Sequence, residues 1–270
     1  MPNPESVIKP SSSVILLAPG DGVGFRVFLL KRAGGSSFMP NRFVFPGGKV
    51  EPSDGADPAS LPAAVACAVR ELWEESGVLL AGPAQALAGL SEGELAEARN
   101  RVDRGQAGLA DTLAGLGLVP DEQALWPYAR WVTPKARPQR FDARFFLALL
   151  PEGQRAESDQ RETSVGLWLS PAQALAENQA GNVELAPPQV RILGELAQET
   201  SLASLMSTPR PDWDQPIEPI LWAKDGKRVI LLPHDPDYPA GQPVQEAAPC
   251  PAGQASRLLH QKGLWLPFQA

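Results

Sequence analysis

The sequence predicts an α+β fold with a helical insertion and a C-terminal extension of helix and hairpin. Two apolar runs near the start, residues 13–18 and 25–32, are typical of neighbouring strands. An acid-rich helix follows a glycine turn, and residues 79–123 are rich in Ala, Leu and Glu. Because 43% of the 270 residues are hydrophobic, the chain can form a sizeable core.

Turn signals separate the first strands. Pro19-Gly20-Asp21-Gly22 joins the first two apolar runs and predicts a hairpin, and residues 36–41 form a loop. Residues 43–45 are expected to form a third, short strand, which Pro46-Gly47-Gly48 interrupts. Because glycine lets the backbone approach a metal ion or a phosphate closely, this turn is a candidate binding element.

A helix is expected between Ser60 and Gly77. Ser60 is a suitable N-cap, Pro62 suits the first turn, and Gly77 suits the end of the helix. Four alanines between residues 63 and 68 add helix propensity. The second half of this segment reads RELWEESGV and carries most of its charge.

Three acidic residues of this helix, Glu71, Glu74 and Glu75, are spaced to share one face. Like charges at this spacing repel each other, so a compensating charge is expected. Arg70, one turn before Glu74, offsets part of the repulsion. A divalent cation would offset far more, and Mg²⁺ prefers carboxylate oxygens, waters and substrate phosphates as ligands.

The middle of the chain predicts more helices and strands. The stretch 79–123 is interpreted as a helical insertion that packs on the domain, with a lid over the substrate as the alternative. The expected elements are helices from Ser91 and at residues 107–116, strands at 125–133, 140–150 and 165–169, and a short helix capped by Ser170.

The C-terminal third predicts an extension and a tail. Residues 187–206 are expected to be helical with a break near Thr200, and residues 219–223 and 228–232 to form a hairpin around Asp225-Gly226. The predicted organisation is a domain at 10–180 with its insertion at about 80–123, a packed extension at 181–235, and a Pro/Gly-rich, poorly ordered tail at 236–270.

Composition excludes several classes of protein. The net charge of −7 provides no global attraction for nucleic acid or membranes. Cys67 and Cys250 do not indicate a disulfide scaffold, and zinc is not expected because His234 and His260 are isolated. The sequence shows neither a membrane span nor a signal peptide, so a cytoplasmic location is expected.

Residues 70–78 resemble the second half of the Nudix box, and Gly47-Gly48 resemble its glycine half. The spacing implies an insertion within residues 53–61, and only Asp54 stands in the register of the first box glutamate. The resemblance implies the Nudix fold, a mixed β-sheet sandwiched between helices. It also implies a metal-dependent diphosphatase that uses Mg²⁺ or Mn²⁺ on a small nucleoside diphosphate derivative.

Further segments narrow the resemblance. Several other segments are similar to the coenzyme A diphosphatase branch of the Nudix hydrolases. They are SFMPNRFVFPGG, the pair WPYARWVTP and RFDARFFL, LAPPQ, and PILWAKDGKRVILLP. This branch implies hydrolysis of coenzyme A or acyl-coenzyme A to 3′,5′-ADP and (acyl-)4′-phosphopantetheine. ADP-ribose, NADH or dinucleotides are the alternative substrates, a non-catalytic nucleotide sensor is a second alternative, and homodimer formation is left open.

The expected site residues follow from these patterns. Arg70 would orient the carboxylates. The general base would be Glu71 or Glu162, and Glu157 is the fallback for Glu162. Glu162 lies six residues before Trp168. The expected metal ligands are Glu71, Glu74, Glu75 and the Gly47 carbonyl. The expected substrate contacts are the cations Arg32, Lys49, Lys135 and Arg140.

Overall fold

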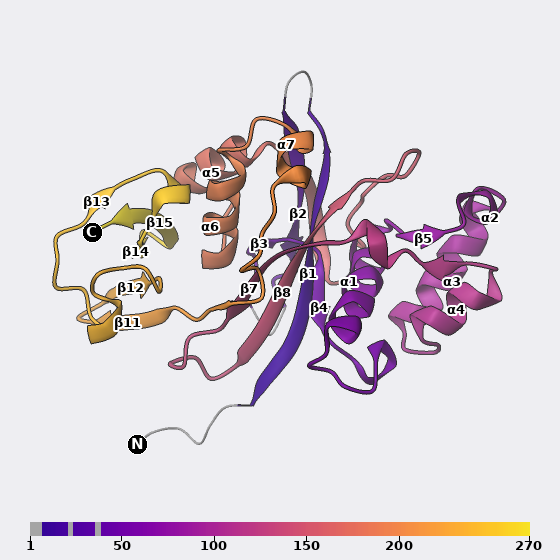
Figure 1. Ribbon diagram of the computed structural model, residues 1–270, viewed down its shortest axis with the longest axis horizontal. Coiled ribbons are helices and arrows are strands. Elements are labelled where there is room, and N and C mark those ends of the chain that lie inside the picture. The colour runs from indigo at the N-terminus through magenta and orange to yellow at the C-terminus, as the bar shows by residue number, and fades with distance from the viewer. Residues whose placement is uncertain (1–6, 21–23, 36–38) are drawn as a thin grey trace.

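A computed structural model describes residues 7–20, 24–35 and 39–270 and shows a mixed β-sheet between two layers of helices (Figure 1). Asp21 and Gly22 of the predicted turn, and residues 36–38 of the predicted loop, lie outside the described residues. The sheet is built from β1 (Ile8–Pro19), β2 (Phe25–Arg32), β3 (Phe43–Val44), β4 (Gly47–Lys49), β7 (Trp126–Val132), β8 (Arg140–Leu149), β9 (Thr163–Leu169) and β10 (Pro216–Ile217).

Strand β1 lies at the centre of this sheet. The order is β10-β7-β8-β1-β2-β3, with β4 also pairing with β1 and β9 with β2. β1 runs parallel to β8 from Ile8 opposite Arg140 to Leu17 opposite Leu149, which explains why it is longer than the predicted 13–18. The two glycines were expected to end a strand, yet Gly47 and Gly48 pair with Ser13 and Ser12 of β1.

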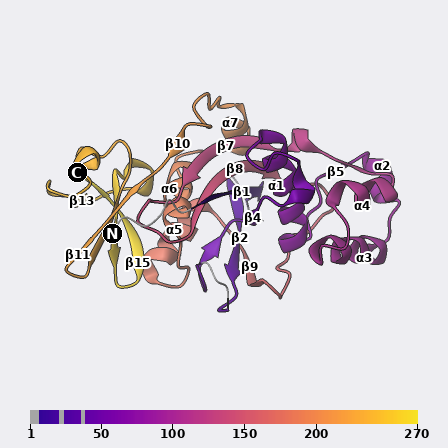
Figure 2. The same ribbon diagram turned by 90° about the horizontal axis from the view of Figure 1, so that it is seen from below.

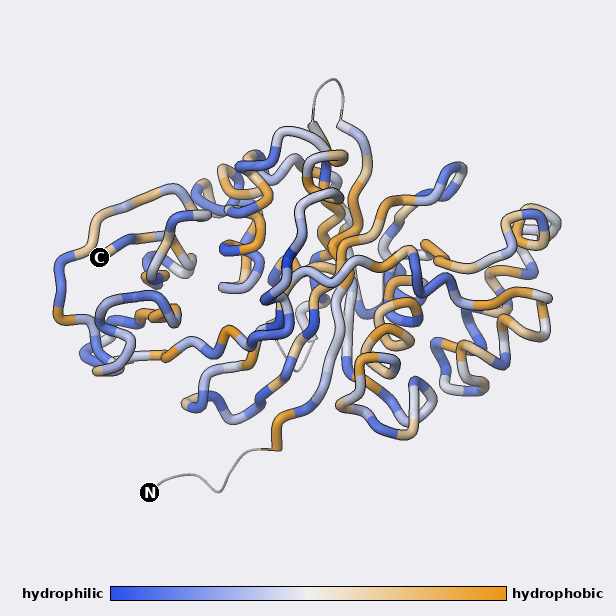
Figure 3. The backbone as a smooth tube through the Cα atoms, viewed as in Figure 1, coloured by the Kyte–Doolittle hydropathy of each residue, from blue (hydrophilic) through white to orange (hydrophobic). Residues whose placement is uncertain are grey.

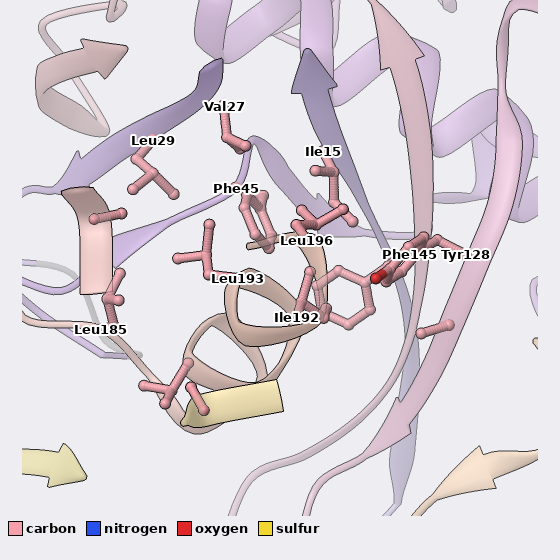
Figure 4. Packing of buried hydrophobic residues seen from close by; sticks show 14 of the residues in the cluster. Ile15, Val27, Leu29, Phe45, Tyr128, Phe145, Leu185, Ile192, Leu193 and Leu196 are labelled. Atoms are coloured by element: carbon pink, nitrogen blue, oxygen red, sulfur yellow. The ribbon is translucent and has the colours of Figure 1, made fainter. Parts of the chain in front are cut away.

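Alternate residues of the central strands face the two helical layers, as the pleat of a strand requires. Val14 and Leu16 belong to the core under α1 (Leu61–Ser76). Ile15 and Leu17 face the opposite layer, α5 (Pro171–Ala180) and α6 (Pro187–Leu196). Figure 4 shows Ile192, Leu193 and Leu196 of α6 packed against this second face, and Figure 3 shows the hydrophobic residues along the central strands.

The insertion follows α1 and forms one end of the molecule (Figure 2). Its helices are α2 (Ala84–Ala88), α3 (Glu92–Asp103) and α4 (Leu109–Gly115). At its base, β5 (Ala81–Gly82) pairs with β6 (Val119–Pro120), and a 3-10 turn, η2 (Glu122–Ala124), leads back to β7. Ala98, Val102 and Leu113 are buried in the same core as α1. The insertion therefore packs on α1, which carries the three glutamates and is called the carboxylate helix below.

The C-terminal third forms a second sheet at the other end. The predicted hairpin is present as β11 (Ile220–Lys224) and β12 (Lys227–Leu231), and α6 and α7 (Leu202–Ser207) flank the predicted break near Thr200. The expectation of a poorly ordered tail at 236–270 is wrong. That segment contains η3 (Tyr238–Ala240), β13 (Ala248–Pro249), η4 (Ala252–Gln254), β14 (Arg257–Gln261) and β15 (Leu264–Gln269), which complete a five-stranded sheet with the hairpin.

A buried ion network explains why this Pro/Gly-rich segment is ordered. Arg257, 1% exposed, donates to both oxygens of Asp235 at 2.6 and 2.7 Å and to Asp237 at 2.9 Å. Helix α6 also packs closely against this segment, because a Cβ added at Gly194 would lie only 2.4 Å from the backbone of Ala252. Long-range ion pairs and close helix packing therefore override what the composition indicates.

No helix in the described ranges combines the length and the apolar run that crossing a bilayer requires.

Replacing Arg257 by Ala should lower the free energy of unfolding by about 3 to 5 kcal/mol, because two buried aspartates lose their cation. Lys227→Ala is the matched control, since it removes an exposed cation from the neighbouring strand and should cost less than about 0.5 kcal/mol. Urea unfolding measures both changes, and equal small losses in the two variants would show that the network does not order the segment.

Candidate active site

Helix α1 presents the acidic motif at its C-terminal half. The Ser60 hydroxyl accepts a hydrogen bond from the Ala63 N–H at the start, and Gly77 ends the helix in the left-handed conformation with its N–H on the Trp73 carbonyl. The apolar face of α1 packs on β1 and β4, so the helix has one fixed rotation. That rotation directs Glu71 and Glu75 toward the glycine turn.

Arg70 is the hub of the site. Its guanidinium is 3% exposed and forms a double hydrogen bond with Asp54, at 2.9 Å for each nitrogen. It also donates to Glu71 Oε1 at 2.9 Å, to Glu74 Oε2 at 2.8 Å, and to the Lys49 carbonyl at 2.9 Å. Asp54 thus takes the position that the box pattern reserves for a glutamate, and it orients the arginine from the turn η1 (Pro52–Asp54).

The inserted segment before α1 is anchored to the sheet. Arg144 of β8 donates to the Ala59 carbonyl at 3.0 Å, one residue before the N-cap. The Ser12 hydroxyl of β1 donates to the Ala64 carbonyl at 2.6 Å inside the first turn. The extra residues of the box therefore leave the start of the carboxylate helix firmly placed.

Glu75 lies deepest of the three glutamates, at 3% exposed, and accepts a hydrogen bond from the Gly47 N–H at 2.8 Å. The Gly47 carbonyl stays a predicted metal ligand, and the N–H of the same residue holds the Glu75 carboxylate. Burial and the neighbouring Glu71 raise the pKa of Glu75, and the Gly47 N–H and Arg32 act in the opposite direction.

Glu71 lies directly over the second glycine. A Cβ on Gly48 would stand 2.3 Å from Glu71 Oε1, so only glycine permits this approach. The pKa of Glu71 is raised to about 7, chiefly by burial and also by the charges of Glu74 and Glu162, against the pull of Arg70. Burial likewise raises the pKa of Glu74, and Arg70 opposes it. The cluster therefore holds more negative charge than its surroundings compensate.

Glu162 directly precedes β9, the strand that pairs with β2. Its carboxylate is among the charges that raise the pKa of both Glu71 and Glu75. Asp159 fixes the backbone there, because its carboxylate accepts from the N–H groups of Glu162 at 3.1 Å and Thr163 at 2.9 Å. Glu157, the fallback, is exposed, and its N–H donates to the Ser76 carbonyl.

Of the four expected substrate cations, Arg32 and Lys49 lie on strands that border the cluster. Arg32, at the end of β2, lowers the pKa of Glu75, and Lys49 is exposed beside Gly48. Lys135 is exposed in the loop between β7 and β8. Arg140 is buried, with Glu218 at 2.5 Å and the Thr133 carbonyl at 3.0 Å. This internal pairing argues against its predicted role, because a buried, paired guanidinium has little charge to offer a phosphate.

Comparison with known proteins identifies the family of this site. Residues 54–196, from the Arg70 partner Asp54 to the end of α6, match the family model described as the NUDT19 Nudix domain. The chain belongs to this family. The predicted Nudix fold and the predicted enzyme class, a Nudix diphosphatase, are thereby confirmed.

Named relatives agree with the family model. The human acyl-coenzyme A diphosphatase NUDT19 is 30% identical over 87% of this chain and 76% of its own length. The chicken protein of the same name is 29% identical over 85% and 81%. The crystal structure of a Nudix hydrolase from Alicyclobacillus acidocaldarius superimposes with a TM-score of 0.65 at 26% identity, covering 75% of this chain and 97% of that one.

The Nudix site suits a hard divalent cation by its donor chemistry. The described residues contain no ready-made group of three acidic, His or Cys side chains in metal-binding geometry. The hydrogen bonds described for Glu71, Glu74 and Glu75 each engage one carboxylate oxygen, so a second oxygen of each is not committed among the described residues. Three hard oxygen donors with surplus negative charge fit Mg²⁺ or Mn²⁺.

Sequence reasoning missed two residues that build the Nudix site. Asp159 had a local signal, because Asp side chains in turns commonly accept hydrogen bonds from backbone N–H groups a few residues further along. Here the donors are the N–H groups of Glu162 and Thr163. Arg99 of α3, which donates to the Glu74 carbonyl at 2.7 Å, had none, because its partner lies 25 residues away.

The metal-free protein should lose stability as the pH rises through the titration of Glu71. The pKa of this group is about 7 in the folded protein against 4.5 ordinarily, so the folded state holds an extra proton between these values. The free energy of unfolding should therefore fall between pH 5 and 7.5, more steeply than in the Glu71→Gln variant. Urea unfolding with EDTA measures both slopes, and identical slopes would contradict the raised pKa.

Proposed function

We propose that this protein hydrolyses the diphosphate bond of coenzyme A or acyl-coenzyme A, releasing 3′,5′-ADP and (acyl-)4′-phosphopantetheine. The observation that carries the proposal is the buried carboxylate cluster around Arg70, in a chain whose relatives in human and chicken are named acyl-coenzyme A diphosphatases. The reaction adds one water across the diphosphate and cleaves one P–O bond.

The cluster would hold Mg²⁺ or Mn²⁺ through Glu71, Glu74 and Glu75. A bound divalent cation lowers the pKa of a bound water and neutralises charge on phosphoryl oxygens. Arg70 keeps two of the three carboxylates directed inward, and Asp54 holds Arg70. The Gly47 N–H holds the third carboxylate.

Glu162 is the residue best placed to accept a proton from the attacking water. It is exposed, its charge acts on both Glu71 and Glu75, and its backbone is held by Asp159. Glu71 is less suited to this role, because its carboxylate would be engaged as a metal ligand. Arg32 and Lys49, on the two strands that border the cluster, would contact the substrate phosphates.

The choice of coenzyme A over other diphosphates is a question of substrate preference. ADP-ribose, NADH and dinucleotides share the diphosphate and would use the same carboxylates. Steady-state turnover of coenzyme A, acyl-coenzyme A, ADP-ribose, NADH and diadenosine polyphosphates, each with Mg²⁺ and Mn²⁺, separates these substrates. The proposal expects the highest kcat/KM for coenzyme A or its acyl esters, and a higher value for any other substrate in the panel would overturn it.

Glu74→Gln and Glu75→Gln should each lower metal-dependent kcat by at least about 100-fold, because each removes an anionic ligand where charge develops. Glu94→Gln is the control, since Glu94 is an exposed capping residue of α3. It should leave kcat unchanged. Circular dichroism verifies folding, and unchanged turnover in either cluster variant would refute the role of that residue.

A further inference from the structure

The insertion helix α3 sends two charged side chains toward the carboxylate helix. Ala98 and Val102 are buried against the α1 core, with Leu95 packed beside them. Arg99 and Asp103 are four residues apart and therefore lie on one side of α3. Both side chains are mostly buried, which is unusual for the charged residues of an insertion with an otherwise solvent-exposed surface.

Arg99 contacts the end of α1. Its guanidinium donates to the Glu74 carbonyl at 2.7 Å, within the last turn, where helix carbonyls lack partners inside the helix. A Cβ on Gly77 would stand 3.1 Å from Arg99 Nη1, so the side chain lies directly over the C-cap. A cation at this end also interacts favourably with the helix dipole.

The same two residues also reach the segment 159–162, which carries Glu162. Asp103 forms an ion pair with Arg161. Burial lowers the pKa of Arg99, and the charges of Asp159 and Glu74 oppose that shift. Asp159 in turn accepts the Glu162 N–H, and the Glu162 carbonyl accepts the Ala33 N–H at 2.9 Å.

These contacts form one connected path between two sides of the active site. Arg99 joins α3 to the backbone of Glu74, and Asp103 joins α3 to Arg161, the neighbour of Glu162. The insertion thus spans from the metal-ligand helix to the loop of the proposed base.

We propose that Arg99 and Asp103 are positioning residues, through which the helical insertion holds the segment 159–162, and with it Glu162, against the carboxylate helix. The insertion then sets the geometry of the catalytic site without touching substrate. The kinetic part of this proposal rests on the proposed function, whereas the structural part does not.

The structural part is tested by amide hydrogen exchange of the full chain. Arg99→Ala and Asp103→Ala should each speed exchange of the peptide that covers residues 157–163 by at least about 10-fold, because its anchors are lost. Arg101→Ala, an exposed arginine on the same helix, should leave it unchanged. Reversing the pair with Asp103→Arg and Arg161→Asp together should restore protection. Unchanged exchange in the first two variants overturns the proposal, whether or not the protein hydrolyses anything.

The kinetic part is tested by combining Arg99→Ala with Glu162→Gln. Arg99→Ala alone should lower kcat by about 10- to 100-fold with little change in KM, because the base is misplaced rather than removed. In the Glu162→Gln background the same change should have almost no further effect, since both act through one group. Equal losses in both backgrounds would show that Arg99 acts on general stability instead. Absence of turnover in the parent protein would refute the proposed function and leave the exchange result to decide the positioning role.

Discussion

One buried guanidinium, that of Arg70, organises the functional half of this molecule. It joins the turn before α1, through Asp54, to two carboxylates of α1 and to the backbone of β4. A buried ion is stable only when its partners compensate it. Here Asp54, Glu71 and Glu74 share the single positive charge of Arg70, and the Glu75 carboxylate adjoins Glu71. When ionised, these carboxylates carry more negative charge than Arg70 neutralises. That surplus makes a dication the natural complement of the site.

The sheet brings the other parts of the site to this arginine. β4 pairs with β1, β1 with β2, and β2 with β9, so the glycine turn, Arg32 and Glu162 arrive at one edge of the carboxylate helix. Four separate segments therefore meet: the end of β2 with Arg32, and residues 47–54, 70–75 and 159–162. The C-terminal sheet covers α6 on the opposite face, away from this chemistry (Figure 1).

The sequence was informative where structure is local. The helix boundaries, the shared face of Glu71, Glu74 and Glu75, and the Asp225-Gly226 hairpin all depend on neighbours within a few residues. It was uninformative where partners are distant. The pairing of Asp54 with Arg70 across an insertion, the burial of Arg140 against Glu218, and the Arg257 network that orders the C-terminal segment are set by tertiary contacts. Asp159 is an intermediate case. Its hydrogen bonds to Glu162 and Thr163 are local, but its importance depends on the place of Glu162 in the folded site.

A bound dication should replace protons in the carboxylate cluster of Glu71, Glu74 and Glu75. Calorimetric titration of Mn²⁺ into the metal-free protein at pH 6.5, repeated in two buffers with different ionisation enthalpies, measures binding and proton release together. Because burial raises the pKa values of Glu71 and Glu75, we predict one saturable site whose occupation releases protons, with the release reduced in Glu71→Gln. Absence of binding, or binding without proton release, would contradict the account.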